Sequence, residues 1–365
     1  MLTSDQNRKI NEIVEEFKEA ADFYRMEYSE DLMGMFRDFG CMLLLKCKVD
    51  TEGKADLERL LEGRHKLKGT VKRQLMTVSE ELAQLWEPGE QDGSGDTGEY
   101  EGSQNVWEMF QTALEEIFHF CLYSKGGKNR YLLPEETAKP LLRLLTFPEG
   151  MMAGNEGLVV LDTQCGAGSA LMAASRYLKN LRLMGYEKDE EMWAAAVIMS
   201  QLSGLEMELH LEDGARADLY ESCDLVISNP VYGTDTIKDE ELIDQLPGEL
   251  KTVRGRYHME LIRSMQALNF DGKAMLIVPN SFLFANRTES MKVRKWLLQS
   301  YSLEAIISLP EDTFMYSGVR SGVMVFSKPF MSGGWEGHTQ RVLYYNLEKQ
   351  EDKEKQQKEY ERLEE

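Results

Sequence analysis

The chain has 365 residues, of which 42% are hydrophobic and 9% aromatic, enough to bury the core of one large α/β domain and a smaller accessory region. Its formal net charge of −21 argues against a protein that binds nucleic acid tightly on its own, because neutralising phosphates requires a basic face. No run reaches 18 apolar residues, so the sequence predicts no transmembrane helix and no membrane partner.

The first residues and the cysteines indicate the cellular compartment, and the histidines bear on metal binding. The start is polar and lacks the apolar core of an export signal, and the five cysteines form no C-x-x-C pair. We therefore expect a cytoplasmic protein without disulfides. The five histidines are scattered and form no ligand cluster, so we expect no bound metal.

The first 125 residues predict a helical N-terminal domain. Apolar side chains recur at helical spacing in two stripes, Ile10-Ile13-Val14-Phe17 and Met33-Met35-Phe36-Phe39. We interpret both stripes as helix packing rather than as ligand sites. Residues 86–105 are rich in glycine and acidic side chains and predict a flexible linker, and residues 106–124 predict a further helix.

Residues 126–345 predict an α/β domain. Apolar runs suit buried strands at 158–162, 181–187, 207–211, 223–228, 274–279, 303–310 and 322–328. Helical stretches separate most of them, at 169–179, 189–203, 258–268 and 288–300. This alternation is typical of a doubly wound sheet. The last two runs lack a crossover helix and predict an antiparallel pair at the sheet edge. Residues 346–365 predict a charged helical tail.

A glycine-rich turn follows the first predicted strand. The strand runs into Asp162-Thr163-Gln164-Cys165-Gly166-Ala167-Gly168, and a helix is predicted to begin at Ser169. This order lets a nucleotide-like ligand approach the backbone, since Gly166 and Gly168 lack the Cβ atoms that would block it. Leu171 stands where a dinucleotide site would have a third glycine, which disfavours that class of site. Glycine turns also serve as plain strand-to-helix connections.

An acidic residue ends the second predicted strand. Glu187 lies nineteen residues after Gly168, at the tip of the neighbouring strand. An acid in this position can accept hydrogen bonds from ribose hydroxyls. A surface glutamate is the alternative, and we favour ribose binding because the glycine turn precedes Glu187 at this spacing.

The fourth predicted strand leads into Asn229-Pro230-Val231-Tyr232. An aromatic amine is a poor nucleophile because its lone pair is delocalised into the ring. The Asn229 side-chain oxygen and the Pro230 carbonyl can accept both amine hydrogens and so favour a pyramidal nitrogen whose lone pair points at a methyl group. Tyr232 offers a flat face on which a base swung out of the helix can stack. Asn-Pro is also a common turn dipeptide.

At these residues the chain resembles the adenine-specific methyltransferase (modification) subunits of type I restriction–modification systems. The likeness covers about residues 130–345. It begins with Tyr131-Leu132-Leu133-Pro134-Glu135-Glu136 and continues through the glycine turn, the helix after Glu187 and the stretch EDGARADLYESCDLVISNPVYG. The segments LNFDGKAMLIVPNSFLF and ISLPEDTFMYSGVRSGVMVFSK resemble the rest of the family's catalytic domain.

The resemblance implies a Rossmann-like class I methyltransferase sheet with an antiparallel edge strand, and S-adenosylmethionine as cofactor. The residues that would hold the cofactor are Asp162, facing its methionine amino group, Asp213, contacting its adenine, and Cys165, Gly166, Gly168 and Glu187. Asn229, Pro230 and Tyr232 would orient the exocyclic N6 amine of adenine in DNA.

The resemblance also accounts for the acidic charge. In the family a separate specificity subunit reads the DNA sequence, and beyond residue 345 this chain has only the short charged tail. We therefore expect DNA and a specificity subunit as partners, with a nuclease subunit left open.

Three positions depart from the family's pattern. Leu133 stands where threonine is usual, Thr163 replaces a proline, and Val231 replaces the second proline of Asn-Pro-Pro-aromatic, which frees its φ angle and adds an N–H donor. The departures motivate one alternative, a catalytically impaired scaffold subunit. A methyltransferase acting on RNA or on a protein glutamine is another, because both present a planar amine.

Overall fold

The computed structural model describes residues 2–29, 31–49, 55–62, 67, 69–86, 101–124, 132–145, 147, 157–220, 222–233, 235–311, 313–314, 319–328 and 341–347. Most of the expected linker (87–100) and nearly all of the expected tail (348–365) lie outside these residues. The chain divides into two compact units. Unit 1 comprises residues 1–132, 164–176 and 182–214, and unit 2 comprises residues 133–163, 177–181 and 215–365. The domain boundaries expected at residues 125 and 345 stay predictions.

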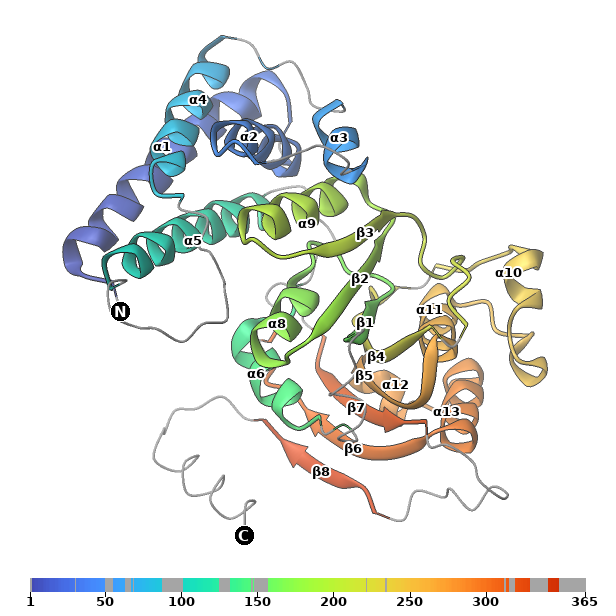
Figure 1. The fold of residues 1–365 in the computed structure, drawn as a ribbon. Coiled ribbons are helices and arrows are strands. Elements are labelled where there is room, and N and C mark those ends of the chain that lie inside the picture. Colours follow the sequence, from blue (N-terminus) through green and yellow to red (C-terminus); the bar gives the residue numbers. More distant parts are fainter. Residues whose placement is uncertain are drawn as a thin grey trace. The chain divides into compact units, whose positions relative to one another are not determined.

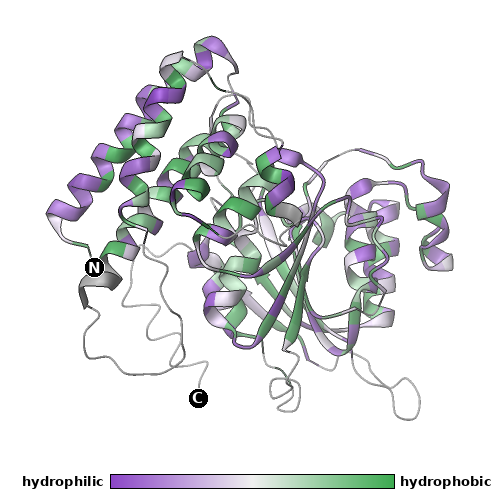
Figure 2. Cartoon of the chain, turned by 45° about the horizontal axis from the view of Figure 1, so that its top comes forward, coloured by the Kyte–Doolittle hydropathy of each residue, from purple (hydrophilic) through white to green (hydrophobic). Residues whose placement is uncertain are grey.

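The N-terminal part of unit 1 is helical, as predicted (Figure 1). Its helices are α1 (Ser4–Glu27), α2 (Met33–Lys46), α3 (Ala55–Glu62), α4 (Gly69–Ala83) and α5 (Glu101–Leu122). Both apolar stripes are buried, and Phe17 of α1 meets Phe39 of α2 edge to face with ring centroids 5.0 Å apart. Figure 2 shows both hydrophobic and hydrophilic residues along the N-terminal helices, whereas the strands are mostly hydrophobic. Helix packing is therefore confirmed as the role of the stripes.

Unit 1 also contains a β-α-β segment of the sheet. The segment consists of β2 (Leu181–Glu187), α9 (Glu190–Leu202) and β3 (Met207–Leu211), and most of α8 (Ser169–Tyr177) belongs to the same unit. The strands β2 and β3 are parallel, with Glu187 opposite Leu211. Helix α9 packs against β3 and also against α2 and α3. Gly40 allows the close approach of α2, because a Cβ there would lie 2.5 Å from the Ile198 side chain.

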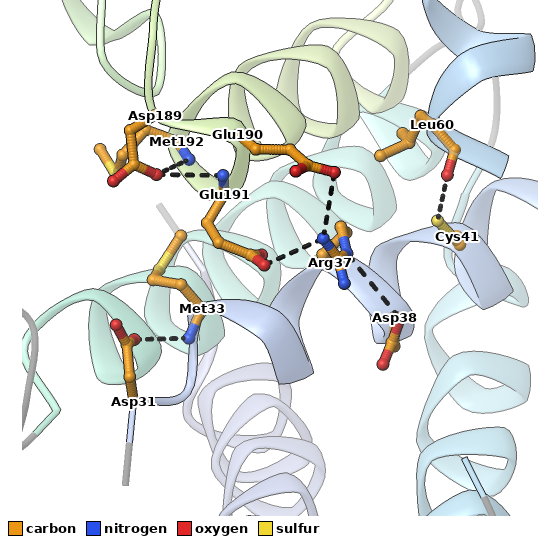
Figure 3. A network of polar contacts seen from close by, with 10 residues as sticks. All are labelled: Asp31, Met33, Arg37, Asp38, Cys41, Leu60, Asp189, Glu190, Glu191 and Met192. Carbon is orange, nitrogen blue, oxygen red and sulfur yellow. Dashed lines mark hydrogen bonds and ion pairs between the residues drawn. The ribbon is translucent and has the colours of Figure 1, made fainter. Parts of the chain in front are cut away.

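A buried arginine joins α2 to the first turn of α9 (Figure 3). Arg37 is 5% exposed, and its Nη1 lies 2.9 Å from Glu191 Oε1 and 3.6 Å from Glu190 Oε1. The Asp189 side chain caps α9 by accepting the N–H groups of Glu191 and Met192. The acidic groups suit a helix N-terminus, and Arg37 offsets their mutual repulsion.

Unit 2 holds the larger part of the sheet. Its strands are β1 (Leu158–Asp162), β4 (Cys223–Ser228), β5 (Leu268–Pro279), β6 (Ser302–Ser308), β7 (Ser321–Ser327) and β8 (Leu343–Asn346). β1, β4 and β5 are parallel neighbours, and β7 runs antiparallel to both β5 and β6. Within unit 2 the strand order is β1-β4-β5-β7-β6-β8. The doubly wound α/β sheet with an antiparallel strand is confirmed.

Three details of unit 2 differ from the sequence prediction. β8 pairs in parallel with β6 and continues the sheet beyond the antiparallel pair, although it is only four residues long and its side chains are largely exposed. β5 begins at Leu268 rather than at residue 274. The prediction missed its first residues because some of them are polar and exposed. The helix predicted at 258–268 is α11 (Arg256–Gln266), which begins and ends two residues earlier. It cannot extend to Leu268 because that residue belongs to β5.

The remaining helices of unit 2 are α6 (Glu135–Arg143), α10 (Glu240–Asp244), the 3₁₀ helix η1 (Gly248–Leu250), α12 (Asn280–Phe284) and α13 (Thr288–Ser300). Helix α11 packs on β4 and β5, and α13 packs on α11 and β6. In the described part of the chain, no helix has both the length and the apolar character that crossing a membrane requires.

The Arg37 network yields a test of unit 1. The change Arg37→Gln is expected to lower the free energy of unfolding by about 2–4 kcal/mol, because the Asp38 and Glu191 carboxylates would lose their buried cation. Arg8 is the matched control, since its side chain is 72% exposed and lies 3.7 Å from Asp5. Arg8→Gln should change stability by less than about 0.5 kcal/mol. Chemical denaturation measures both, and equal effects would contradict the anchoring role of Arg37.

Candidate functional site

The glycine turn after β1 has the backbone geometry that its glycines permit. Gly166 and Gly168 have φ angles of +56° and +79°, in the left-handed region that strains residues with a Cβ. The Gly168 N–H donates to the Cys165 carbonyl at 2.8 Å and closes the turn. The Cys165 N–H donates to the Tyr186 carbonyl of β2 at 2.9 Å, so β2 holds the turn in place.

Glu187, at the end of β2, contacts this turn directly. Its Oε2 accepts the Gly166 N–H at 2.9 Å, and its Oε1 accepts the Asp189 N–H at 2.7 Å. Burial raises the pKa of Glu187, and the backbone donors act in the opposite direction. A carboxylate has about four acceptor positions, so the backbone donors of Gly166, Asp189 and Lys188 leave capacity for a hydroxyl group of a ligand. Unit 1 thus brings together Cys165, Gly166, Gly168 and Glu187.

The two aspartates of the predicted cofactor site lie at the ends of other strands. Asp213 follows β3 in unit 1, and the N–H of its neighbour Glu212 donates to the Glu187 carbonyl at 2.9 Å. Its side chain is partly buried. Asp162 is the last residue of β1 in unit 2 and is 2% exposed. The proposed contacts of both aspartates with a cofactor stay predictions.

The loop Asn229-Pro230-Val231-Tyr232 leaves the carboxyl end of β4 in unit 2. β4 is a buried strand between β1 and β5. Pro230 is buried, Asn229 and Tyr232 are partly buried, and the Val231 side chain is 41% exposed. Because Val231 is exposed at this loop, its replacement of a proline changes backbone freedom rather than core packing.

A chain of buried hydroxyl groups links the ends of β1 and β4 in unit 2. Thr163 Oγ1 lies 2.5 Å from Ser264 Oγ, which lies 3.4 Å from Ser228 Oγ. Ser264 donates its single proton to the Glu260 carbonyl at 2.8 Å, so it accepts the Thr163 hydroxyl. Thr163, where the family has proline, therefore anchors the residue next to Asn229 through α11. Leu133, the third departure from the family's pattern, is 3% exposed and acts as a core residue.

Sequence patterns missed the residues that hold the segment after Tyr232. Glu289 of α13 accepts the N–H groups of Arg254 and Gly255 at 2.9 and 3.0 Å. The Arg256 N–H donates to the Asp235 carbonyl at 2.8 Å, which ties the segment to the start of α11. These contacts join residues far apart in the chain, and no local spacing indicates them.

The predicted site residues therefore form two groups. Cys165, Gly166, Gly168, Glu187 and Asp213 lie in unit 1, whereas Asp162, Asn229, Pro230 and Tyr232 lie in unit 2. The roles expected of the residues in both groups stay predictions. The closeness of the two groups stays a prediction.

Comparison with known proteins gives the family. The model of the family N-6 DNA Methylase matches residues 110–365. The methylase subunit of the type I restriction enzyme MjaVII of Methanocaldococcus jannaschii is 24% identical over 298 residues, which cover 75% of this chain and 47% of that protein. The chain spans half the length or less of the curated relatives it matches.

Two solved structures share the fold at low sequence identity. A Listeria monocytogenes protein described as a class I S-adenosylmethionine-dependent methyltransferase has a TM-score of 0.69 at 17% identity, covering 97% of this chain and 98% of that one. The type I restriction–modification methyltransferase subunit of Streptococcus thermophilus has a TM-score of 0.58 at 16% identity, covering 92% and 87%. Because the family model matches residues 110–365, which are most of this chain, the chain belongs to the N-6 DNA methylase family.

Proposed function

We propose that this protein transfers a methyl group from S-adenosylmethionine to the exocyclic N6 amine of adenine in DNA. The observation that carries the proposal is the loop Asn229-Pro230-Val231-Tyr232 at the end of a buried strand in a member of the N-6 DNA methylase family. The resemblance to type I modification subunits and the fold support the same reaction.

The residues of unit 1 fit the cofactor. Glu187 would bind a ribose hydroxyl with the acceptor capacity that its backbone hydrogen bonds leave open. The left-handed glycines let the ligand approach the backbone, and Asp213 would contact the adenine ring of the cofactor. When bound, S-adenosylmethionine supplies an electrophilic methyl group on a sulfonium.

Asn229 and Pro230 would activate the amine. The Asn229 side-chain oxygen and the Pro230 carbonyl each accept one amine hydrogen, which withdraws the nitrogen lone pair from the ring. Tyr232 would stack on the extruded base and hold its plane. The amine nitrogen then forms the new N–C bond at the expense of the methyl–sulfur bond. The surplus proton leaves to water after this step, so no strong general base is required.

The protein would act with partner subunits in the cytoplasm, where the DNA substrate lies. Its net charge of −21 makes tight DNA binding by this chain alone unfavourable, and its curated relative is a subunit of a larger enzyme. We therefore propose a specificity subunit that reads the DNA sequence, and a nuclease subunit in the same system.

Methylation with the co-expressed partner tests the catalytic residues. Asn229→Ala is expected to lower N6-methyladenine formation at least about 100-fold, because one of two groups that polarise the amine is lost. Asn7→Ala, at an exposed position of α1, is the control and should methylate like the wild type. Equal product from wild type and Asn229→Ala would overturn the catalytic role. The absence of product from both, with folded protein, would indicate a scaffold subunit.

Calorimetry with S-adenosylmethionine tests the ribose acid. Glu187→Ala is expected to weaken binding about 10- to 100-fold, the value of one hydrogen bond to a charged acceptor. Glu206→Ala changes an exposed glutamate of the same unit and should leave affinity unchanged. Burial raises the pKa of Glu187, and protonation removes an acceptor, so wild-type affinity should fall on acidification at a higher pH than for an exposed glutamate. Unchanged affinity in Glu187→Ala would exclude the ribose role.

A further inference from the structure

Four aromatic rings gather beyond the carboxyl ends of β4 and β5 in unit 2. Tyr257 of α11 meets Tyr232 edge to face, with ring centroids 5.7 Å apart and planes at 72°. The same Tyr257 ring contacts His258 at 5.4 Å and Phe282 of α12 at 5.9 Å. We call these four residues the aromatic cluster. The cluster includes Tyr232, the ring proposed to stack on the target base.

Tyr257 has a buried hydroxyl group without a hydrogen bond. The side chain is 7% exposed, and its Oη has no hydrogen-bond partner within the described parts of the chain. Buried polar groups in folded proteins nearly always have partners, so an orphaned hydroxyl needs an explanation. Burial raises the pKa of the Tyr257 phenol well above its usual range, which keeps it protonated and able to donate.

The imidazole of His258 lies close to two side chains of α13. His258 Nε2 lies 2.8 Å from Ser290 Oγ, and its Nδ1 lies 3.5 Å from Glu289 Oε2. Burial lowers the pKa of His258, so it favours the neutral form. Phe282 carries no polar side-chain atom. Tyr257 thus gives the cluster a buried, protonated hydroxyl with which to bind a ligand.

The backbone fixes Tyr257 beside the loop that carries Tyr232. The Ile237 N–H donates to the Arg254 carbonyl at 2.7 Å, and the Arg256 N–H donates to the Asp235 carbonyl at 2.8 Å. These bonds hold the segment after Tyr232 against the first turn of α11. These backbone bonds preorganise the Tyr257 ring beside Tyr232.

Resting on the proposed function, we propose that the Tyr257 hydroxyl donates a hydrogen bond to a ring nitrogen of the target adenine. Adenine has acceptor nitrogens, N1 and N7, on both sides of its amino group. Asn229 and Pro230 would accept hydrogen bonds from the amine while Tyr257 donates one to the ring. The three residues together would recognise a base that has a ring-nitrogen acceptor next to an amino donor. A base that presents an N–H at that position would leave two donors facing each other. Tyr257 is thereby a base-binding residue.

The test compares two tyrosine-to-phenylalanine variants of the full chain with its co-expressed partner. Tyr257→Phe removes the orphaned hydroxyl. Tyr301→Phe is the matched control, because the buried Tyr301 hydroxyl donates to the Met265 carbonyl at 2.8 Å within the protein. The measurements are thermal unfolding and the rate of N6-methyladenine formation on unmethylated plasmid DNA.

The two variants should behave in opposite ways. Tyr257→Phe is expected to lower kcat/KM for DNA about 3- to 10-fold and to leave Tm unchanged or raised, since no bond within the protein is lost. Tyr301→Phe is expected to lower Tm and to keep the wild-type kcat/KM. Wild-type kcat/KM in Tyr257→Phe, or a Tm as low as that of Tyr301→Phe, would overturn the proposal. An inactive wild type would refute the proposed function instead.

Discussion

Parallel pairing of buried strands is the constraint on which the rest of this structure depends. Strands that run the same way end at the same edge, so residues that follow neighbouring strands come together whatever their separation in sequence. In unit 1 this pairing places Glu187 and Asp213 after β2 and β3. In unit 2 it places Asp162 and Asn229 after β1 and β4. In each group, the direction of the strands determines where the site residues lie, and their side-chain chemistry then determines what they can bind.

Local patterns in the sequence predicted most of the strands and helices. The apolar runs at 158–162, 181–187, 207–211 and 223–228 are strands with those bounds. β1 and β4 are buried along most of their length, and a strand buried on both faces has few polar positions to obscure its apolar run. Strand β8 was not predicted, since its apolar run is short and its side chains are largely exposed. Contacts such as those of Arg37 with Glu191, or of Thr163 with Ser264, span more than a hundred residues, and only the folded chain defines them.

The departures from the family's pattern are better explained by the structure than by loss of function. Thr163 gains a hydroxyl that Ser264 accepts, and Leu133 gains a place in the core. Both substitutions are thus stabilised by their surroundings. Val231 alone alters the loop that would hold the base, and its exposed side chain has no place in the core.

Stability and binding place opposite demands on the buried hydroxyls of unit 2. A hydroxyl that serves only the fold should be bonded within the protein, as Tyr301 is to Met265, because leaving it unpaired is unfavourable. A hydroxyl that serves a ligand must keep a donor for it and so lowers the stability of the empty protein. Tyr257 fits the second description, and its neighbours explain why the cost is tolerated. Edge-to-face contacts with Tyr232, His258 and Phe282 hold the ring in place, so the hydroxyl can stay unbonded without loosening α11.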